Sequence, residues 1–177
     1  MAQPSTSSSS SSIAPAYRVL FLYAEPFGAL YGALLAGRTP LKYLYLVSPG
    51  GAPAHYHPSL QVVLDQLAAT YFLFAFNEAV VLRIAGDGSG GSSGSSGTAN
   101  VRVWSAMLCG MLLCDLLHIN AARNALGGWA ALLDPAGWRF EEWVVMVPTV
   151  LFAAARVAFL LGFGVAGEKV KPKTKTG

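Results

Sequence analysis

Among the polar and charged side chains inside the long apolar segments of this sequence, six could do chemistry together. They are Glu25, Asn77, Glu78, Asp115, His118 and Arg156. A charged side chain in the middle of a bilayer costs about 2.5–3.5 kcal/mol on insertion scales, so each charged position is a candidate functional residue. We expect these six residues to form one intramembrane polar pocket.

The balance of charge in this group predicts its chemistry. The three acids bring three negative charges if all of them ionise, whereas Arg156 brings one positive charge. An apolar environment and neighbouring carboxylates both disfavour the charged form of an acid, so at least one carboxyl is expected to remain neutral. A neutral carboxyl beside a fixed cation can donate a proton to a double bond or bind an amine.

Other interpretations of the same side chains remain open. Polar groups in helical membrane proteins often only hold helices together, and each hydrogen bond of this kind contributes about 0.6 kcal/mol to stability. Asn77 is expected to have this role. Movement of protons or ions is a further alternative. Asp115 and His118 are three residues apart on one helical face, so His118 can satisfy or orient Asp115. One helix supplies only two ligands, so no metal site and no cofactor is predicted.

The composition excludes a soluble enzyme as the first interpretation. Of the 177 residues, 54% are hydrophobic and 12% are charged, whereas a soluble domain has about 25% charged residues. Four segments are long enough to cross about 30 Å of hydrocarbon. The sequence therefore predicts an all-α fold, an integral membrane bundle of four transmembrane helices. The expected spans are about 17–36, 60–82, 103–122 and 143–165.

Alternating span directions place the charged residues at similar depths. With a rise of about 1.5 Å per residue, Glu25, Glu78 and Arg156 lie about 7–13 Å from the membrane surface nearest both termini. By the same measure, Asp115 lies about one turn deeper. Glu25 also shares a helical face with Gly32 and other small residues, which let helices approach closely. The spans therefore have the geometry to bring these side chains together.

The expected membrane domain covers residues 17–166. It follows a disordered serine-rich tail at 1–16, contains a flexible Gly/Ser loop at 86–98, and precedes a basic cytosolic tail at 167–177. Basic residues are more numerous on the side of the termini, so both termini are predicted to face the cytosol. The tail lysines account for the positive net charge, and the rest of the chain offers no basic face for nucleic acid.

The last five residues carry Lys173 and Lys175 in a K-x-K-x-x pattern. This pattern resembles cytosolic di-lysine retrieval signals, and the resemblance implies that the protein resides in the endoplasmic reticulum. The alternative is a generic basic tail that contacts anionic lipid headgroups.

Each expected span carries a short motif. The motifs are Glu25-Pro26, Asn77-Glu78-Ala79 with Arg83, Asp115-x-x-His118, and Arg156-x-x-Phe159. Jointly they resemble a family of small four-span membrane proteins of filamentous fungi, grouped as a domain of unknown function. A looser, fold-level similarity to the emopamil-binding sterol isomerases and the sigma-2 receptor implies an endoplasmic-reticulum protein with acids inside a lipophile-filled cavity.

The predicted function is that of a multi-pass membrane protein that binds or isomerises a lipophilic, sterol- or terpene-like small molecule in its polar pocket. The alternative is a non-catalytic membrane scaffold or accessory subunit, whose buried polar residues only fix helix packing. The expected partners are the lipid bilayer and the small molecule, with a homo-oligomer left open. The sequence specifies no reaction, because the Gly-rich stretch at 86–97 lacks the G-x-x-x-x-G-K spacing of a phosphate-binding loop.

Overall fold

The computed structural model describes residues 13–51, 55–87 and 96–165. This part of the chain is helical and contains no β-strand, and four of its helices are long and apolar enough to cross a membrane. The predicted all-α four-helix membrane bundle is therefore confirmed. Lys173 and Lys175 lie outside the described residues, as do most of the serine tail and the centre of the Gly/Ser loop. The spanning helices are Pro15–Arg38, Pro58–Ala85, Val101–Leu126 and Phe140–Leu160.

The first span is one continuous helix made of three segments. Its α-helical ends, α1 (Pro15–Val19) and α2 (Glu25–Arg38), are joined by a wider π-helical turn, η1 (Leu20–Ala24). A short helix, α3 (Pro40–Val47), follows directly. Proline begins both α1 and α3, where it is tolerated because the first N–H groups of a helix have no partner within it.

The second span has the same organisation as the first. Two α-helical segments, α4 (Pro58–Phe76) and α5 (Leu82–Asp87), flank a π-helical turn, η2 (Asn77–Val81). The third span lies in α6 (Ser96–Leu126), the longest helix described. The expected Gly/Ser loop is therefore shorter than predicted at both ends, since α5 reaches Asp87 and α6 begins at Ser96.

The third and fourth spans are joined by α7 (Trp129–Leu132) and a 3-10 turn, η3 (Pro135–Gly137). The fourth span, α8 (Phe140–Leu160), ends before residue 165, where the sequence predicts its end. The reason is Gly162, whose φ of +85° suits glycine. Next to it, the N–H of Phe163 bonds back to the carbonyl of Ala158 at 3.0 Å, which closes the helix.

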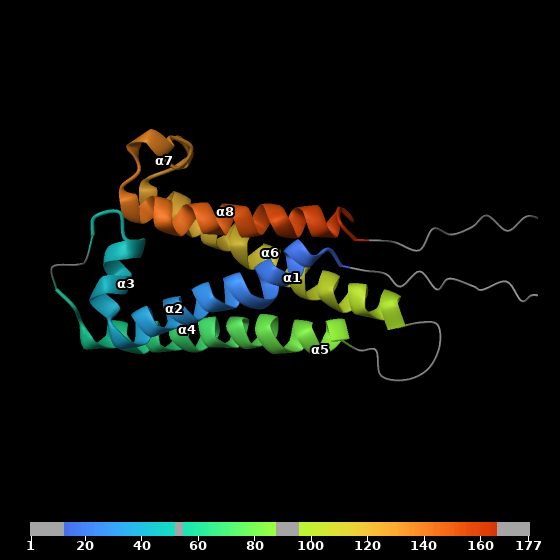
Figure 1. Cartoon of the computed structure of the whole chain (residues 1–177). Helices are drawn as coiled ribbons and strands as arrows, with labels where there is room; N and C mark the ends of the chain where they lie inside the picture. The colour runs from blue at the N-terminus through green and yellow to red at the C-terminus, as the bar shows by residue number, and fades with distance from the viewer. Residues whose placement is uncertain (1–12, 52–54, 88–95, 166–177) are drawn as a thin grey trace, which may run out of the picture.

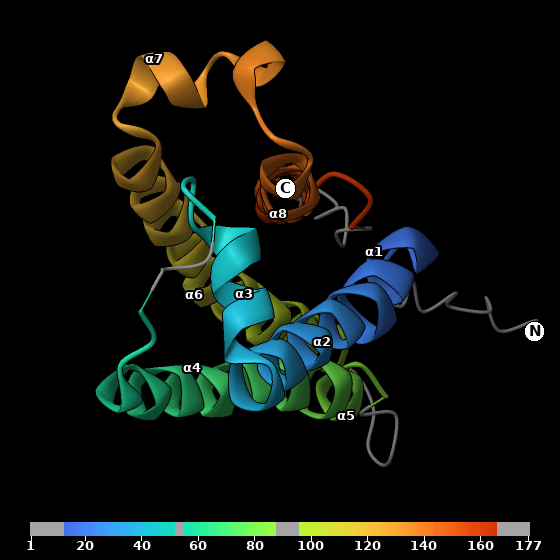
Figure 2. The same cartoon turned by 90° about the vertical axis from the view of Figure 1, so that its left-hand side faces the viewer.

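The four spans pack as two pairs, α2 with α4 and α6 with α8 (Figure 1). Small residues allow α2 and α4 to approach each other closely. A Cβ atom on Gly32 would lie 3.4 Å from the ring of Tyr71, and one on Gly37 would lie 3.7 Å from Ala68. Gly32 of the predicted small-residue face therefore meets α4, whereas a Cβ atom on Gly28 of the same face would meet no atom within 4 Å. The view along the bundle shows α2 crossing over α4 (Figure 2).

A hydrophobic core joins the two pairs at the end that carries α1 and the last turn of α8. The indole Nε1 of Trp104 donates a hydrogen bond to the carbonyl of Leu82 at 3.0 Å. A single β-bridge connects Ile13 to Val165 at the same end. The buried members of this core are Phe21, Leu22, Leu82, Trp104, Leu108 and Phe159.

At the opposite end, α3 connects the two pairs because it packs on both α2 and α8. Arg139, directly before α8, holds α3 in place. Its Nη2 donates to the carbonyl of Ser48 at 2.8 Å, and its guanidinium lies 5.9 Å from the ring centroid of Tyr45. The helix pairs are thus held together at both ends of the bundle.

Candidate functional site

Glu25 and Glu78 stand at the two π-helical turns. Glu25 directly follows η1, and its N–H bonds to the carbonyl of Leu20, five residues back. Pro26 has no N–H, so a regular helix would leave the Leu22 carbonyl without its partner. Glu78 lies inside η2, and η1 packs on η2. Single π-helical turns of this kind are frequent at functional sites.

Arg156 of α8 binds carboxyl groups from the other three spans. Its Nη1 donates to Oδ2 of Asp115 on α6, and its Nη2 donates to Oε1 of Glu25 on α2. The same Nη2 lies 3.4 Å from Oε1 of Glu78. The Arg156 side chain is 1% exposed and that of Glu78 is 0% exposed. All four spans therefore meet at one buried guanidinium.

The polar atoms of this cluster are only partly satisfied. Three carboxyl groups surround one positive charge, and the oxygens Oε2 of Glu25 and of Glu78 have no hydrogen-bond partner among the described residues. Nε of Arg156 is also without a partner there. Glu25 and Glu78 converge on the same nitrogen, so a proton on one of them removes the repulsion between two adjacent carboxylates.

Apolar groups that sequence reasoning missed complete the surroundings of Arg156. Its guanidinium lies 5.6 Å from the ring centroid of Phe21, and its Nη2 lies 4.0 Å from Sδ of Met111. Helical spacing is the signal that could have identified both residues. Phe21 precedes Glu25 by four residues, and Met111 precedes Asp115 by four, so each lies on the face of its acid.

The structure brings four of the six candidate residues into one ion cluster. His118 lines the cavity beside this cluster, and Asn77 is not part of that lining. Asp115 bonds to Arg156 across the bundle, so its partner is not His118 on its own helix. Among the described residues, His118 and Asn77 make no side-chain hydrogen bond. No group of three or more His, Cys, Asp or Glu in the described part of the chain could hold a metal ion.

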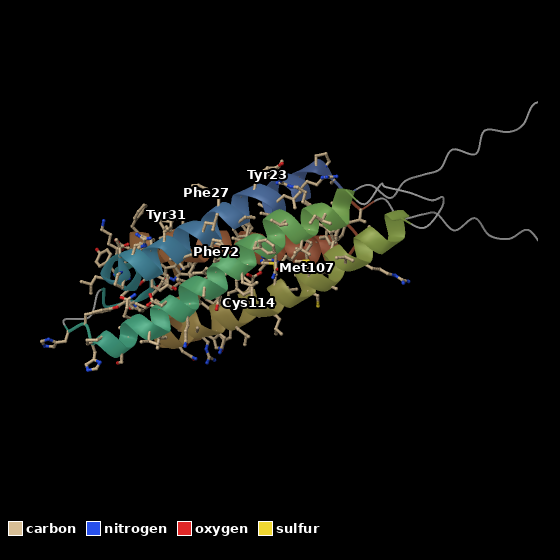
Figure 3. The ribbon with its side chains drawn as sticks, turned by 90° about the horizontal axis from the view of Figure 1, so that it is seen from below. Tyr23, Phe27, Tyr31, Phe72, Met107 and Cys114 are labelled. Carbon is tan, nitrogen blue, oxygen red and sulfur yellow. The ribbon has the colours of Figure 1, made fainter. Side chains whose placement is uncertain are left out.

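A cavity of about 340 Å³ begins at this cluster and extends between the helix pairs toward α3. Its walls are mostly apolar and include Phe74 and Phe152. Gly28 forms part of the wall, and a Cβ atom placed on it would meet no atom within 4 Å. Tyr31 and Val144, which are 57% and 45% exposed, also line it, so the cavity reaches the outer surface of the bundle. Figure 3 shows Tyr31 on the outer side of the first span.

The far end of the cavity contains a second set of polar groups. The hydroxyls of Tyr43 on α3 and Tyr71 on α4 are hydrogen-bonded at 2.9 Å, and His118 lines the same region. A further cavity of about 230 Å³ lies between α3 and the α6/α8 pair and shares Tyr43, Val47 and His118 with the first. Neither tyrosine belongs to a sequence motif, and tyrosine is common at the ends of membrane helices, so no sequence pattern predicts this pair.

The comparison with known families finds a match over most of the chain. The profile of a domain of unknown function, DUF7704, matches residues 10–166, which include all four spans and every member of the Arg156 cluster. No curated protein and no solved structure matches the chain. The chain belongs to the DUF7704 family, a group of proteins defined by a domain of unknown function.

Proposed function

We propose that this protein binds a lipophilic small molecule in the cavity between the α2/α4 and α6/α8 pairs. The observation that carries the proposal is that buried carboxyl oxygens without partners, on Glu25 and Glu78, stand at the end of an apolar cavity. Polar groups that served packing alone would be expected to satisfy one another, because an unsatisfied buried group costs about 1–3 kcal/mol.

The size and lining of the cavity support a small-molecule ligand. Pockets for such ligands measure about 300–1,000 Å³ and are mainly apolar with a few placed polar groups. The cavity of about 340 Å³ is in this range, and its lining combines aromatic side chains with a carboxyl cluster at one end. A rigid hydrocarbon of the sterol or terpene class fits this combination of size and polarity.

The cluster also supports a chemical step, the movement of a double bond. A protonated carboxyl of Glu25 or Glu78 breaks its O–H bond and forms a C–H bond at one alkene carbon. The resulting carbocation lies beside carboxylates, which stabilise it. Loss of a proton from the neighbouring carbon to a carboxylate completes the shift and restores the number of protons on the cluster. Arg156, which contacts Glu25 and Asp115, favours the charged form of an accepting carboxylate.

A scaffold or accessory subunit is the second candidate function, favoured by the direct bonds from Arg156 to three other spans. In that case, the cluster holds the helices together and the cavity has no specific occupant.

The location of the protein in the endoplasmic reticulum and the cytosolic orientation of both termini stay predictions from the basic residues. Protease protection of tagged termini in sealed microsomes tests the orientation.

Purification in a mild detergent followed by native mass spectrometry tests the proposed function. We expect wild-type protein to retain a lipophilic molecule, and Glu25→Gln and Asp115→Asn to lose it while remaining monodisperse. Asp65→Asn is the matched control, because Asp65 is an exposed acid of α4 that bonds Gln61 at 2.6 Å, away from the cavity. An empty wild-type protein whose unfolding temperature does not respond to added sterols or terpenes would favour the scaffold instead.

A further inference from the structure

We propose that Tyr43, Tyr71 and His118 form a second polar subsite, which binds an oxygen atom at the far end of the ligand. This inference rests on the proposed function and names its ligand class. The ligand is an elongated lipophile that carries a hydroxyl or carbonyl oxygen at the end distant from the carboxyl cluster. It is recognised at both ends.

The two tyrosines are held in place by packing. The ring of Tyr71 lies against Gly32 of α2, where a Cβ atom would be 3.4 Å away. Tyr43 is 8% exposed and belongs to a buried cluster with Ala36 and Leu64. Its hydroxyl meets that of Tyr71 at 2.9 Å. Both hydroxyls therefore have defined positions at the wall of the cavity.

The two tyrosine hydroxyls have one more hydrogen-bond donor than the bond between them uses. Two hydroxyls carry two hydrogens, and the bond between Tyr43 and Tyr71 uses one of them. The second hydrogen has no acceptor among the described residues. Burial, followed by the neighbouring Tyr71, raises the pKa of Tyr43, so its hydroxyl keeps its proton and remains a donor. An oxygen acceptor on a ligand would satisfy the free hydrogen.

His118 adds a donor and an acceptor to the lining of the same cavity. It stands on α6 and lines both the main cavity and the smaller one between α3 and the α6/α8 pair. A neutral imidazole offers one N–H and one acceptor nitrogen, and neither has a partner in the described part of the chain. A ligand hydroxyl, which both donates and accepts, can therefore be bound from two sides.

The spacing of the two polar ends sets the length of the ligand. Tyr71 and Glu78 belong to one continuous helix and are seven residues apart, which corresponds to about 10 Å along the axis. The wall between them is apolar and includes Phe74. A molecule that engages both ends therefore needs a rigid apolar body of about this length. Short or one-ended lipophiles can fill only part of the site.

Three steroids that differ only in their oxygen atoms test this inference. Androstanediol has a hydroxyl at each end, androstanol has one, and androstane has none. Dissociation constants are measured with tritiated steroid and full-length protein in detergent. We expect the diol to bind wild-type protein about tenfold more tightly than androstanol, the effect of one or two added hydrogen bonds.

Removal of a single hydroxyl links this difference to the subsite. In Tyr43→Phe and in Tyr71→Phe, the diol is expected to bind no better than androstanol, while androstanol keeps its wild-type affinity. Tyr45→Phe is the matched control on α3, because Tyr45 lines neither cavity. Equal affinities of diol and androstanol for wild-type protein would overturn the second subsite but leave the proposed function standing. Binding of none of the three steroids would overturn both.

Discussion

The guanidinium of Arg156 and the carboxyl of Glu78 lie 3.4 Å apart, although 78 residues separate them in the sequence. Both side chains are buried, and both belong to helices long enough to cross a membrane. The same guanidinium also bonds Glu25 and Asp115. The stability of the bundle and the chemistry of the cavity therefore depend on the same few atoms, and variants at these positions can separate the two roles.

Replacement of Arg156 by methionine is expected to destabilise the protein by about 3–5 kcal/mol, because it leaves buried acids without their cation. A triple variant that adds Glu25→Gln and Asp115→Asn should recover part of this loss, since the unpaired acids are then removed. Unfolding temperatures in a single detergent measure both effects. If the single and triple variants are equally unstable, charge compensation is not what Arg156 contributes.

Of the three acid-to-amide changes, Glu78→Gln should destabilise the protein least, by about 1 kcal/mol or less. Glu78 has the longest contact with Arg156, and glutamine resembles a protonated carboxyl. Glu25→Gln removes a direct ion pair and should cost about 3 kcal/mol. Thermal unfolding with Asp65→Asn as the exposed control ranks them. A larger loss for Glu78→Gln than for Glu25→Gln would mean that Glu78 is the charged member of the pair.

Gly28→Leu should block the cavity without weakening the fold. A side chain on Gly28 enters open space, and leucine favours a helix over glycine by about 0.8 kcal/mol. Retention of a lipophile in native mass spectrometry should fall while the unfolding temperature holds. Gly32→Leu is the contrasting variant, because its side chain meets the Tyr71 ring and should cost about 1–3 kcal/mol. Unchanged ligand retention in Gly28→Leu would place the ligand elsewhere.

The stability of the protein should fall in strongly alkaline solution through Tyr43. Burial and the adjacent Tyr71 raise the pKa of Tyr43 above its ordinary value of 10.0. The folded state then holds this proton more tightly than the unfolded state, so the stabilisation is complete below about pH 10 and is lost as the pH rises further. Unfolding temperatures measured upward from about pH 9 should fall less steeply in Tyr43→Phe than in wild type. Tyr45→Phe should follow the wild-type curve, and equal slopes for all three proteins would refute the linkage.

The sequence alone predicts that the charged residues of different spans lie near one another. Hydropathy predicts four spans, and their alternating directions put Glu25, Glu78 and Arg156 at similar depths, because the rise of a helix converts sequence position into height. The same periodicity predicts that Gly32 faces a neighbouring helix. These features depend on one helix at a time, and local sequence contains that information.

Contacts between helices were decided only by the tertiary structure. His118 is the helical neighbour of Asp115, yet Asp115 bonds Arg156, because the rotation of each helix depends on its packing partners. The segment 41–47 is too short to show a helical repeat of hydrophobic residues. Only the packing of α3 on α2 brings the hydroxyl of Tyr43 to that of Tyr71. The cavity likewise exists because α2 pairs with α4 and α6 with α8, a choice that no single helix contains.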